Sequence, residues 1–206
     1  LIGYEDALRV SSNTFFYQVG YEVGVDEIHE VSKKLGFNSF SGIEISEQEN
    51  IGLVASSQWA KEGRGWGEPG KTPWLPEDIA SMSIGQMVVQ VTPIQIARAY
   101  AAIANGGYLV TPHLTKKDEG YLSDKSRIKI DIDPKHIQLV KNGLKKVVES
   151  GTGVSINTGV TNLPPVAGKT GTAEDWKTGL DHAWFVCFTP SDKSELLVVA
   201  FAQNTP

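Results

Sequence analysis

The sequence contains the tripeptide Lys-Thr-Gly twice, and these residue types suit the binding of a peptide that ends in a carboxylate. The two copies are Lys169–Gly171 and Lys177–Gly179. A lysine attracts a carboxylate, and a hydroxyl can donate a hydrogen bond to it. In the first copy Lys169 lies near the start of a predicted strand, and the small residues Thr172 and Ala173 follow it. Small residues there would let a ligand lie along the backbone as an added strand.

The second copy has the sequence context of a turn. It lies between Trp176 and Asp181, in the polar connection before the apolar run 182–188. Thr178 and Gly179 are residues that commonly form turns. We therefore predict that the second copy forms the turn of a β-hairpin, whereas the first copy lies on the edge of a strand.

The tripeptide Ser11-Ser12-Asn13 lies upstream of both copies. In a Ser-x-Asn element the hydroxyl of Ser11 could relay a proton, and the side-chain amide of Asn13 could hold a peptide group. A helix cap is the alternative use of Ser12 or Asn13, and the tripeptide taken alone favours the cap. Ser-x-Asn followed by Lys-Thr-Gly, together with a Ser-x-x-Lys element, is the signature of penicillin-binding proteins and class A β-lactamases.

Motifs that would bind a cofactor or a metal are incomplete. A phosphate loop at Gly168-Lys169-Thr170 would need a glycine at position 163, where Leu163 stands. The segment 65–70 matches the dinucleotide pattern by letter, but Pro69 and the sequence after it cannot open the required helix. The four histidines show no metal-ligand spacing. We therefore expect no cofactor and no metal.

The composition is that of a folded domain with an acidic surface. The 206 residues are 40% hydrophobic and 21% charged, and the formal net charge is -5. This charge gives no basic face, so we expect no nucleic-acid partner. The longest apolar run, 196–202, is far shorter than the about 20 residues that cross a bilayer. The single cysteine, Cys187, lies in an apolar run and is predicted to be buried.

Hydrophobic periodicity predicts an α/β (α+β) fold, in which an antiparallel sheet is covered by helices. Thr92 and Gln95 are predicted to form a capping box, and Gly36, Gly106 and Gly151 to end helices. The last two strands are apolar on both faces, which predicts helices on both sides of the sheet. Expected helices cover 13–23, 26–35, 93–105 and 134–150, and expected strands cover 108–110, 166–173, 182–189 and 195–203.

Longer stretches resemble the transpeptidase domain of class B penicillin-binding proteins, most closely the elongation type, penicillin-binding protein 2. These stretches are ALRVSSNTFFYQVG, SIGQMVVQVTPIQIARAYAAIANGG, YLVTPHL and VAGKTGTAEDWKTGLDHAWFVCF. The resemblance implies the fold shared by penicillin-binding proteins and serine β-lactamases, with one partial transpeptidase domain over residues 1–206. Residues 1–165 would form its mostly helical and loop part, and residues 166–204 its three-stranded sheet.

The resemblance also implies a role for individual residues. Ser11 would relay a proton, Asn13 would position a substrate amide, and Lys169 would attract the substrate carboxylate. Thr172 would offer its backbone N–H to the oxyanion hole and its hydroxyl to the carboxylate. The implied catalytic residues are Ser11, Asn13 and Lys169, and the implied substrate-binding residues are Thr170, Gly171 and Thr172.

The nucleophile of this family is the serine of a Ser-x-x-Lys helix that precedes Ser-x-Asn, and residues 1–10 contain no such element. Ser126-Arg127-Ile128-Lys129 matches by letter, but it lies after Ser-x-Asn in a strongly charged stretch. A nucleophile needs its lysine in a sheltered pocket, so we interpret Ser126 as a surface residue. We therefore expect a nucleophile outside this chain, a domain incomplete at both ends, and no activity of the chain alone.

The resemblance implies a peptidoglycan D,D-transpeptidase that cross-links stem peptides ending in D-Ala-D-Ala through a serine acyl-enzyme during cell-wall elongation. Penicillin and other β-lactams would acylate the same serine. A membrane glycosyltransferase is the implied partner, at the periplasmic or extracellular face of the bacterial inner membrane, with an N-terminal anchor outside this chain. Two alternatives stay open: a D,D-carboxypeptidase or β-lactamase of the same fold, and a non-catalytic domain that senses peptide or β-lactam.

The two Lys-Thr-Gly copies provide a first test. In the complete protein we expect Lys169→Ala to slow acylation by penicillin at least about tenfold, because only this lysine would face the substrate carboxylate. Lys177→Ala is the matched control and should change the rate little. Timed labelling with a fluorescent penicillin measures both rates, and equal effects of the two substitutions would contradict the assignment.

Overall fold

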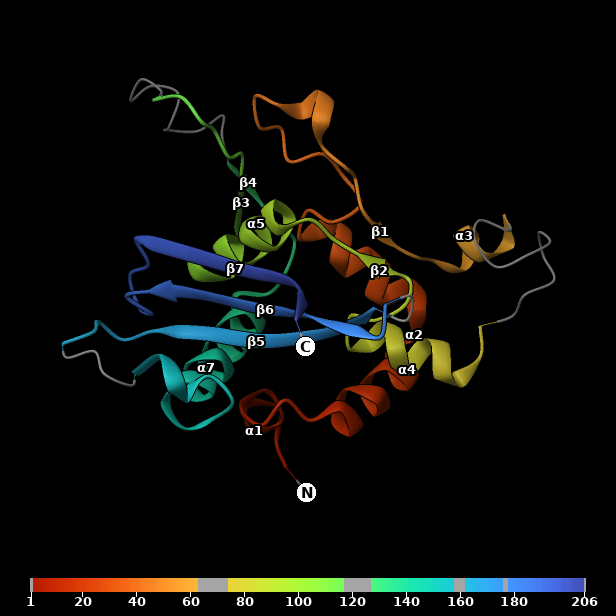
Figure 1. Ribbon diagram of the computed structural model, residues 1–206, viewed down its shortest axis with the longest axis horizontal. Coiled ribbons are helices and arrows are strands. Elements are labelled where there is room, and N and C mark those ends of the chain that lie inside the picture. Colours follow the sequence, from red (N-terminus) through yellow and green to blue (C-terminus); the bar gives the residue numbers. More distant parts are fainter. Residues whose placement is uncertain (1, 63–73, 117–126, 158–161, 176–177, 206) are drawn as a thin grey trace.

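The computed structural model describes residues 2–62, 74–116, 127–157, 162–175 and 178–205, and Figure 1 shows how its elements are arranged. The helices are α1 Tyr4–Arg9, α2 Asn13–Lys34, α3 Ser57–Lys61, α4 Pro76–Ser83, α5 Pro93–Ala104 and α7 Pro134–Ser150, with the 3-10 helices η1 Ser46–Gln48 and η2 Val154–Asn157. The strands are β1 Leu53–Val54, β2 Val89–Gln90, β3 Tyr108–Val110, β4 Arg127–Lys129, β5 Ala167–Asp175, β6 Leu180–Thr189 and β7 Leu196–Thr205.

The three C-terminal strands form one antiparallel sheet in the order β5-β6-β7, which confirms the predicted meander. β5 is an edge strand, so one of its sides is free of strand pairing among the described residues. Helices α5 and α7 lie on the same face, behind the sheet in Figure 1. There Phe188 of β6 is fully buried against Ala104 of α5 and Leu144 of α7.

The opposite face of the sheet is covered at one corner within the described residues. At that corner the end of α7 reaches round to this face: Cys187 is buried with Val166 and with Val148 of α7, and Ile156 of η2 packs against them. This confirms the prediction for the cysteine. Along β7, in contrast, Leu196 and Val198 are 59% and 44% exposed. The prediction of helices on both sides therefore holds for one face of the described structure. A strand that is apolar on both faces shows only that burying both would be favourable, not which segment covers them.

The first long helix follows the predicted boundaries. Within α2, Gly24 has a φ of 78° and a ψ of 166°, so two helical segments meet there, as the sequence predicts. Gly36 has a left-handed φ of 90° after the second segment, and the N–H of Phe37 donates to the carbonyl of Ser32 at 3.1 Å. This arrangement satisfies a carbonyl group that the end of a helix leaves without a partner.

Helices α2 and α4 pack closely against each other. A Cβ atom on Gly20 of α2 would lie 2.6 Å from the Cβ of Ser83 in α4, so the close approach requires a glycine here. Next to this contact, Val25, Val54 and Met82 form a buried cluster that joins the two helices to β1. The middle of α2 and the end of α4 therefore belong to one packed layer.

The helix predicted over 134–150 is α7, and its residues Leu144 and Val147 are buried. Helix α1 packs across α7. A Cβ atom on Gly143 would lie 2.5 Å from Cδ1 of Leu8, so the glycine determines how closely α1 can approach. Helix α7 packs on β5 as well, so α1 and β5 contact the same helix.

The remaining strands form two short antiparallel ladders, β1 with β2 and β3 with β4. The strand predicted at 108–110 is confirmed as β3. In the part of the chain that the structure describes, no helix is both long and apolar enough to cross a membrane. The glycine-rich segment 65–70 lies outside the described residues.

Helix α5 begins at the predicted capping box. The hydroxyl of Thr92 accepts the backbone N–H of Gln95 at 3.3 Å, and Oε1 of Gln95 accepts the backbone N–H of Thr92 at 3.0 Å. The Gln95 side chain also donates to the carbonyls of Ser39 and Ile51. The start of α5 is therefore tied to the loop that precedes β1.

Removal of this cap tests its contribution to stability. We expect Thr92→Ala to lower the free energy of unfolding by about 1 kcal/mol, because the N–H of Gln95 loses its acceptor. Thr92→Ser keeps the hydroxyl and is the matched control. Urea denaturation of the complete domain measures both variants, and equal stability of the two would contradict this contribution.

Candidate active site

The structure brings the Ser-x-Asn element and the first Lys-Thr-Gly element together. Nζ of Lys169 donates a hydrogen bond of 2.8 Å to Oγ of Ser11, although the two residues are 158 positions apart in the sequence. The same ammonium donates to the carbonyl oxygen of Thr170, also at 2.8 Å. An ammonium in contact with a hydroxyl is an arrangement in which a proton can pass between the two groups.

The backbone around Ser11 turns sharply between α1 and α2. Ser11 has a φ of 54°, a left-handed conformation that is uncommon for a residue other than glycine. The N–H groups of Ser11 and Ser12 donate to the carbonyls of Leu8 and Ala7 at 3.1 and 2.9 Å. The end of α1 therefore holds the turn that presents Ser11 to the sheet.

The neighbouring residues show that the tripeptide is not a simple helix cap. Ser12 is at the N-cap position of α2, but its side chain makes no capping hydrogen bond. Its hydroxyl lies 3.3 Å from the hydroxyl of Thr14 instead. Asn13 is the first helical residue, and its side chain is exposed. Among the described contacts, Ser11 reaches Lys169 and Asn13 does not.

Lys169 lies half-buried between the sheet and the turn. Burial lowers the pKa of its ammonium below the ordinary value for a lysine, because the charged form loses contact with water. A lysine with a lowered pKa gives up its proton more readily near neutral pH. Lys169 thus has the position and the electrostatic surroundings of a group that exchanges protons with Ser11.

The free edge of β5 carries backbone groups that a peptide could pair with. The carbonyls of Thr170 and Thr172 accept side-chain hydrogen bonds from Lys169 and Gln86, so both carbonyls point away from β6. In an antiparallel ladder the N–H and the C=O of one residue point to the same side. The N–H of Thr172 therefore lies on this edge too, where an added strand or an oxyanion could reach it.

Gly171 lies on the face of β5 that carries Lys169, where the neighbouring strand packs closely. It pairs with Trp184 of β6, and a Cβ atom on Gly171 would lie 3.3 Å from the Cβ of Trp184. Trp184 in turn packs on Phe201 of β7, with ring centroids 4.3 Å apart. A larger residue at 171 would therefore press on this aromatic pair. The glycine therefore suits the close packing of β5 against β6.

The sequence analysis missed two residues that contact the same strand. The hydroxyls of Thr152 and Thr170 lie 2.8 Å apart, and the N–H of Thr152 donates to the carbonyl of Arg9 at 3.2 Å. Nε2 of Gln86 donates to the carbonyl of Thr172 at 3.2 Å. The Gly-Thr-Gly sequence at the end of α7 was the available signal for Thr152, whereas nothing local distinguishes Gln86.

Comparison with known proteins shows the family to which the chain belongs. The family described as "Penicillin binding protein transpeptidase domain" matches residues 1–206. The chain belongs to the penicillin-binding protein transpeptidase family. Peptidoglycan D,D-transpeptidase MrdA of Haemophilus influenzae is 33% identical over 218 residues, which cover 96% of this chain and 32% of that protein.

Solved structures of this transpeptidase family have the same fold. Pseudomonas aeruginosa PBP2, in complex with WCK 5153, matches with a TM-score of 0.82 and 30% identity over 98% of this chain and 44% of that one. A chain of a peptidoglycan synthase complex, studied for the structural coordination of polymerization and crosslinking, matches with a TM-score of 0.80 and 33% identity. That match covers 98% of this chain and 34% of the other. The predicted family and fold class are confirmed.

Two sequence predictions concern residues beside the site of this transpeptidase domain. The second Lys-Thr-Gly copy falls between β5 and β6, where Thr178 donates to a carboxylate oxygen of Asp175 and Gly179 has a left-handed φ of 68°. This is the predicted turn, although Lys177 itself lies outside the described residues. Ser126 also lies outside them, so its assignment to the surface stays a prediction.

The lowered pKa of Lys169 predicts how stability depends on pH. Between the folded pKa and the ordinary value near 10.4, the unfolded chain binds more protons at this residue, so stability should rise with pH there. Lys169→Met removes the charge. We expect the free energy of unfolding of the wild type to increase relative to that of Lys169→Met as the pH rises in this range. Urea denaturation of the complete domain from pH 7 upward measures both, and parallel pH profiles would contradict the prediction.

Proposed function

We propose that the protein containing this domain is a peptidoglycan D,D-transpeptidase of the elongation type, which forms a serine acyl-enzyme and binds penicillin. The observation that supports this most is the 2.8 Å hydrogen bond from Lys169 to Ser11 on a strand with a free edge. The proposal also rests on the Haemophilus influenzae relative, whose name describes a peptidoglycan D,D-transpeptidase. The chain spans 32% of that relative's length, so activity of the whole protein is part of the proposal.

The first chemical step would be acylation. The oxygen of a Ser-x-x-Lys serine, outside this chain, attacks the carbonyl carbon between the two D-Ala residues, and its proton leaves to a base. The oxyanion of the tetrahedral intermediate accepts a hydrogen bond from the N–H of Thr172 on the free edge of β5. Collapse of this intermediate breaks the C–N bond, and the hydroxyl of Ser11 passes a proton to the leaving nitrogen. Lys169 lies 2.8 Å from that hydroxyl and can replace the proton.

Binding of the substrate would use the same strand. The terminal carboxylate of the stem peptide meets the hydroxyls of Thr170 and Thr172 and the charge of Lys169. Gly171 allows the peptide to approach, and Asn13 holds its amide. Thr152 lies 2.8 Å from Thr170, hydroxyl to hydroxyl, so it would orient the Thr170 hydroxyl toward the carboxylate.

The second step would transfer the acyl group to an amine of a neighbouring stem peptide, forming the new amide bond and releasing the serine. The reverse proton path, from the attacking amine through Ser11, follows from microscopic reversibility. We propose that this occurs at the periplasmic or extracellular face of the inner membrane, beside a membrane glycosyltransferase. The similarity to a chain of a complex that coordinates polymerization and crosslinking supports that partner.

The proton relay is tested by replacing Ser11. In the complete protein we expect Ser11→Ala to lower the second-order rate of acylation by penicillin by about 10²-fold, because the leaving nitrogen loses its proton donor. Ser12→Ala is the matched control, since the Ser12 hydroxyl contacts Thr14 instead. Fluorescent penicillin and rapid quenching measure the rates.

Further measurements of acylation and of acyl release separate the proposal from its alternatives. The 206-residue chain alone should form no adduct by intact mass, and an adduct on it would contradict an external nucleophile. Release of the acyl group to water at least as fast as to a peptide amine would indicate a carboxypeptidase or β-lactamase. Acylation with no turnover of peptide would indicate a sensor. Equal rates for Ser11→Ala and Ser12→Ala would contradict the relay.

A further inference from the structure

The side chain of Gln86 occupies a backbone acceptor on the free edge of β5. Its Nε2 donates to the carbonyl oxygen of Thr172 at 3.2 Å, across 86 positions of sequence. Thr172 and Thr170 are the residues whose carbonyls point to this edge. A peptide that binds as an added strand needs such carbonyls as acceptors for its own N–H groups. Gln86 and an added strand would therefore use the same atom.

The backbone of Gln86 is fixed at the end of α4. Gly85 has a left-handed φ of 81°, and its N–H donates to the carbonyl of Met82 at 3.0 Å. The N–H of Gln86 donates to the carbonyl of Ser81 at 2.9 Å, which completes the double hydrogen bond of a Schellman motif. Since α4 packs on α2, the layer that presents Ser11 to the sheet also places Gln86 there.

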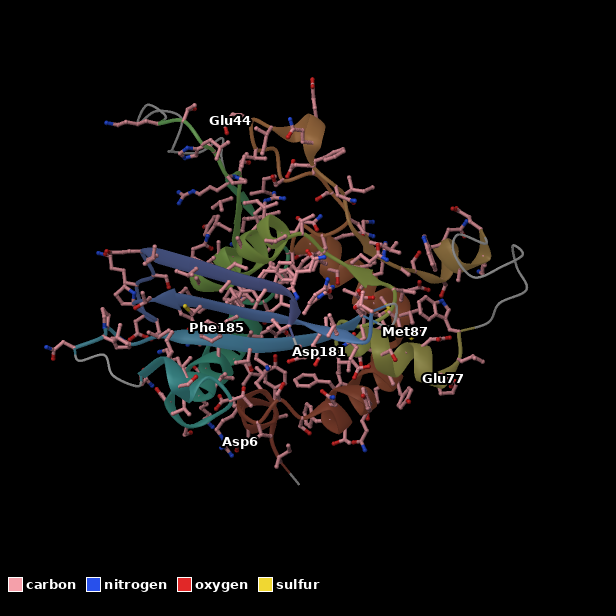
Figure 2. The ribbon with its side chains drawn as sticks, in the orientation of Figure 1. Asp6, Glu44, Glu77, Met87, Asp181 and Phe185 are labelled. Carbon is pink, nitrogen blue, oxygen red and sulfur yellow. The ribbon has the colours of Figure 1, made fainter. Side chains whose placement is uncertain are left out.

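The residue after Gln86 is held in an unfavourable conformation. Met87 has a φ of 56°, which is rare for a residue with a long side chain, and it is 53% exposed. Figure 2 shows Met87 beside the end of the sheet that also carries Asp181, where α4 meets the strands. A strained residue keeps its conformation only while surrounding contacts hold it. Backbone hydrogen bonds hold the chain on both sides of Met87: the N–H of Gln86 donates to Ser81, and the carbonyl of Val88 accepts the N–H of Ala55.

We propose that Gln86 is a latch on the substrate strand: it covers the carbonyl of Thr172 in the free protein and releases it when a peptide pairs with β5. This inference rests on the proposed function. The exchange is nearly balanced, because one hydrogen bond between an amide and a carbonyl replaces another. The latch thus protects the edge without blocking a substrate that offers an N–H at this position.

The test compares acylation rates in the complete protein. Gln86→Ala removes the donor, and Gln86→Met keeps the length of the side chain without a donor and without adding a charge. We expect both to raise the second-order rate of acylation by a penicillin about two- to tenfold, the equivalent of one ordinary hydrogen bond. Gln58→Ala is the matched control, because it removes a 3.0 Å glutamine hydrogen bond to Glu62 within α3 and should leave the rate unchanged.

A second β-lactam makes the test specific to the Thr172 carbonyl. A penicillin carries a side-chain amide whose N–H can donate to the Thr172 carbonyl in place of Gln86. A carbapenem carries no such side-chain amide. The gain should therefore be larger for the penicillin than for the carbapenem. A general loosening of the fold would change both rates alike, and melting temperatures of all variants report on such loosening.

Each outcome bears on the inference. Faster penicillin acylation in both Gln86 variants, with a smaller gain for the carbapenem, supports the latch. Slower acylation in both would show that Gln86 orients the strand for catalysis and would overturn the latch, as would unchanged rates or equal gains for the two β-lactams. Absence of any adduct in the wild type would overturn the proposed function and the latch with it, which separates this result from a failure of the latch alone.

Discussion

The hydrogen bond from Lys169 to Ser11 connects the sheet to the helical part of the molecule, and the candidate site depends on it. Burial makes the ammonium of Lys169 costly, which is the reason for its lowered pKa. The hydroxyl of Ser11 and the carbonyl of Thr170 offset part of that cost as acceptors. The same lysine thus holds two elements together and is able to exchange a proton.

Glycines at helix contacts determine whether this hydrogen bond can form. Gly143 lets α1 lie against α7, where a Cβ atom would lie 2.5 Å from Leu8. At the end of α7 a Cβ atom on Gly151 would lie 2.2 Å from the carbonyl oxygen of Arg9. Because protein interiors are close-packed, larger residues at these positions would displace α1. Ser11 would then move away from the strand, and so would Thr152, which follows Gly151.

The free edge of β5 combines two physical requirements. A bare strand edge is a site for pairing with other chains, so proteins usually cover or charge it. A strand that binds a peptide must nevertheless keep its edge accessible. Here the Thr170 and Thr172 carbonyls accept hydrogen bonds from the movable side chains of Lys169 and Gln86. Side chains can leave such an edge without any change in the sheet, whereas a paired strand could not.

The sequence by itself determined the features that depend on neighbouring residues: the Thr92 cap, the stop at Gly36, the break at Gly24 and the strand meander. It also identified the two motifs that meet at the site, through their residue types and order. Only the tertiary structure decided that Ser11 contacts Lys169 while Asn13 does not, which face of the sheet the helices cover, and that Gln86 reaches Thr172. These outcomes depend on contacts between residues far apart in the sequence, and close packing at a few glycines decides such contacts, which no local pattern encodes.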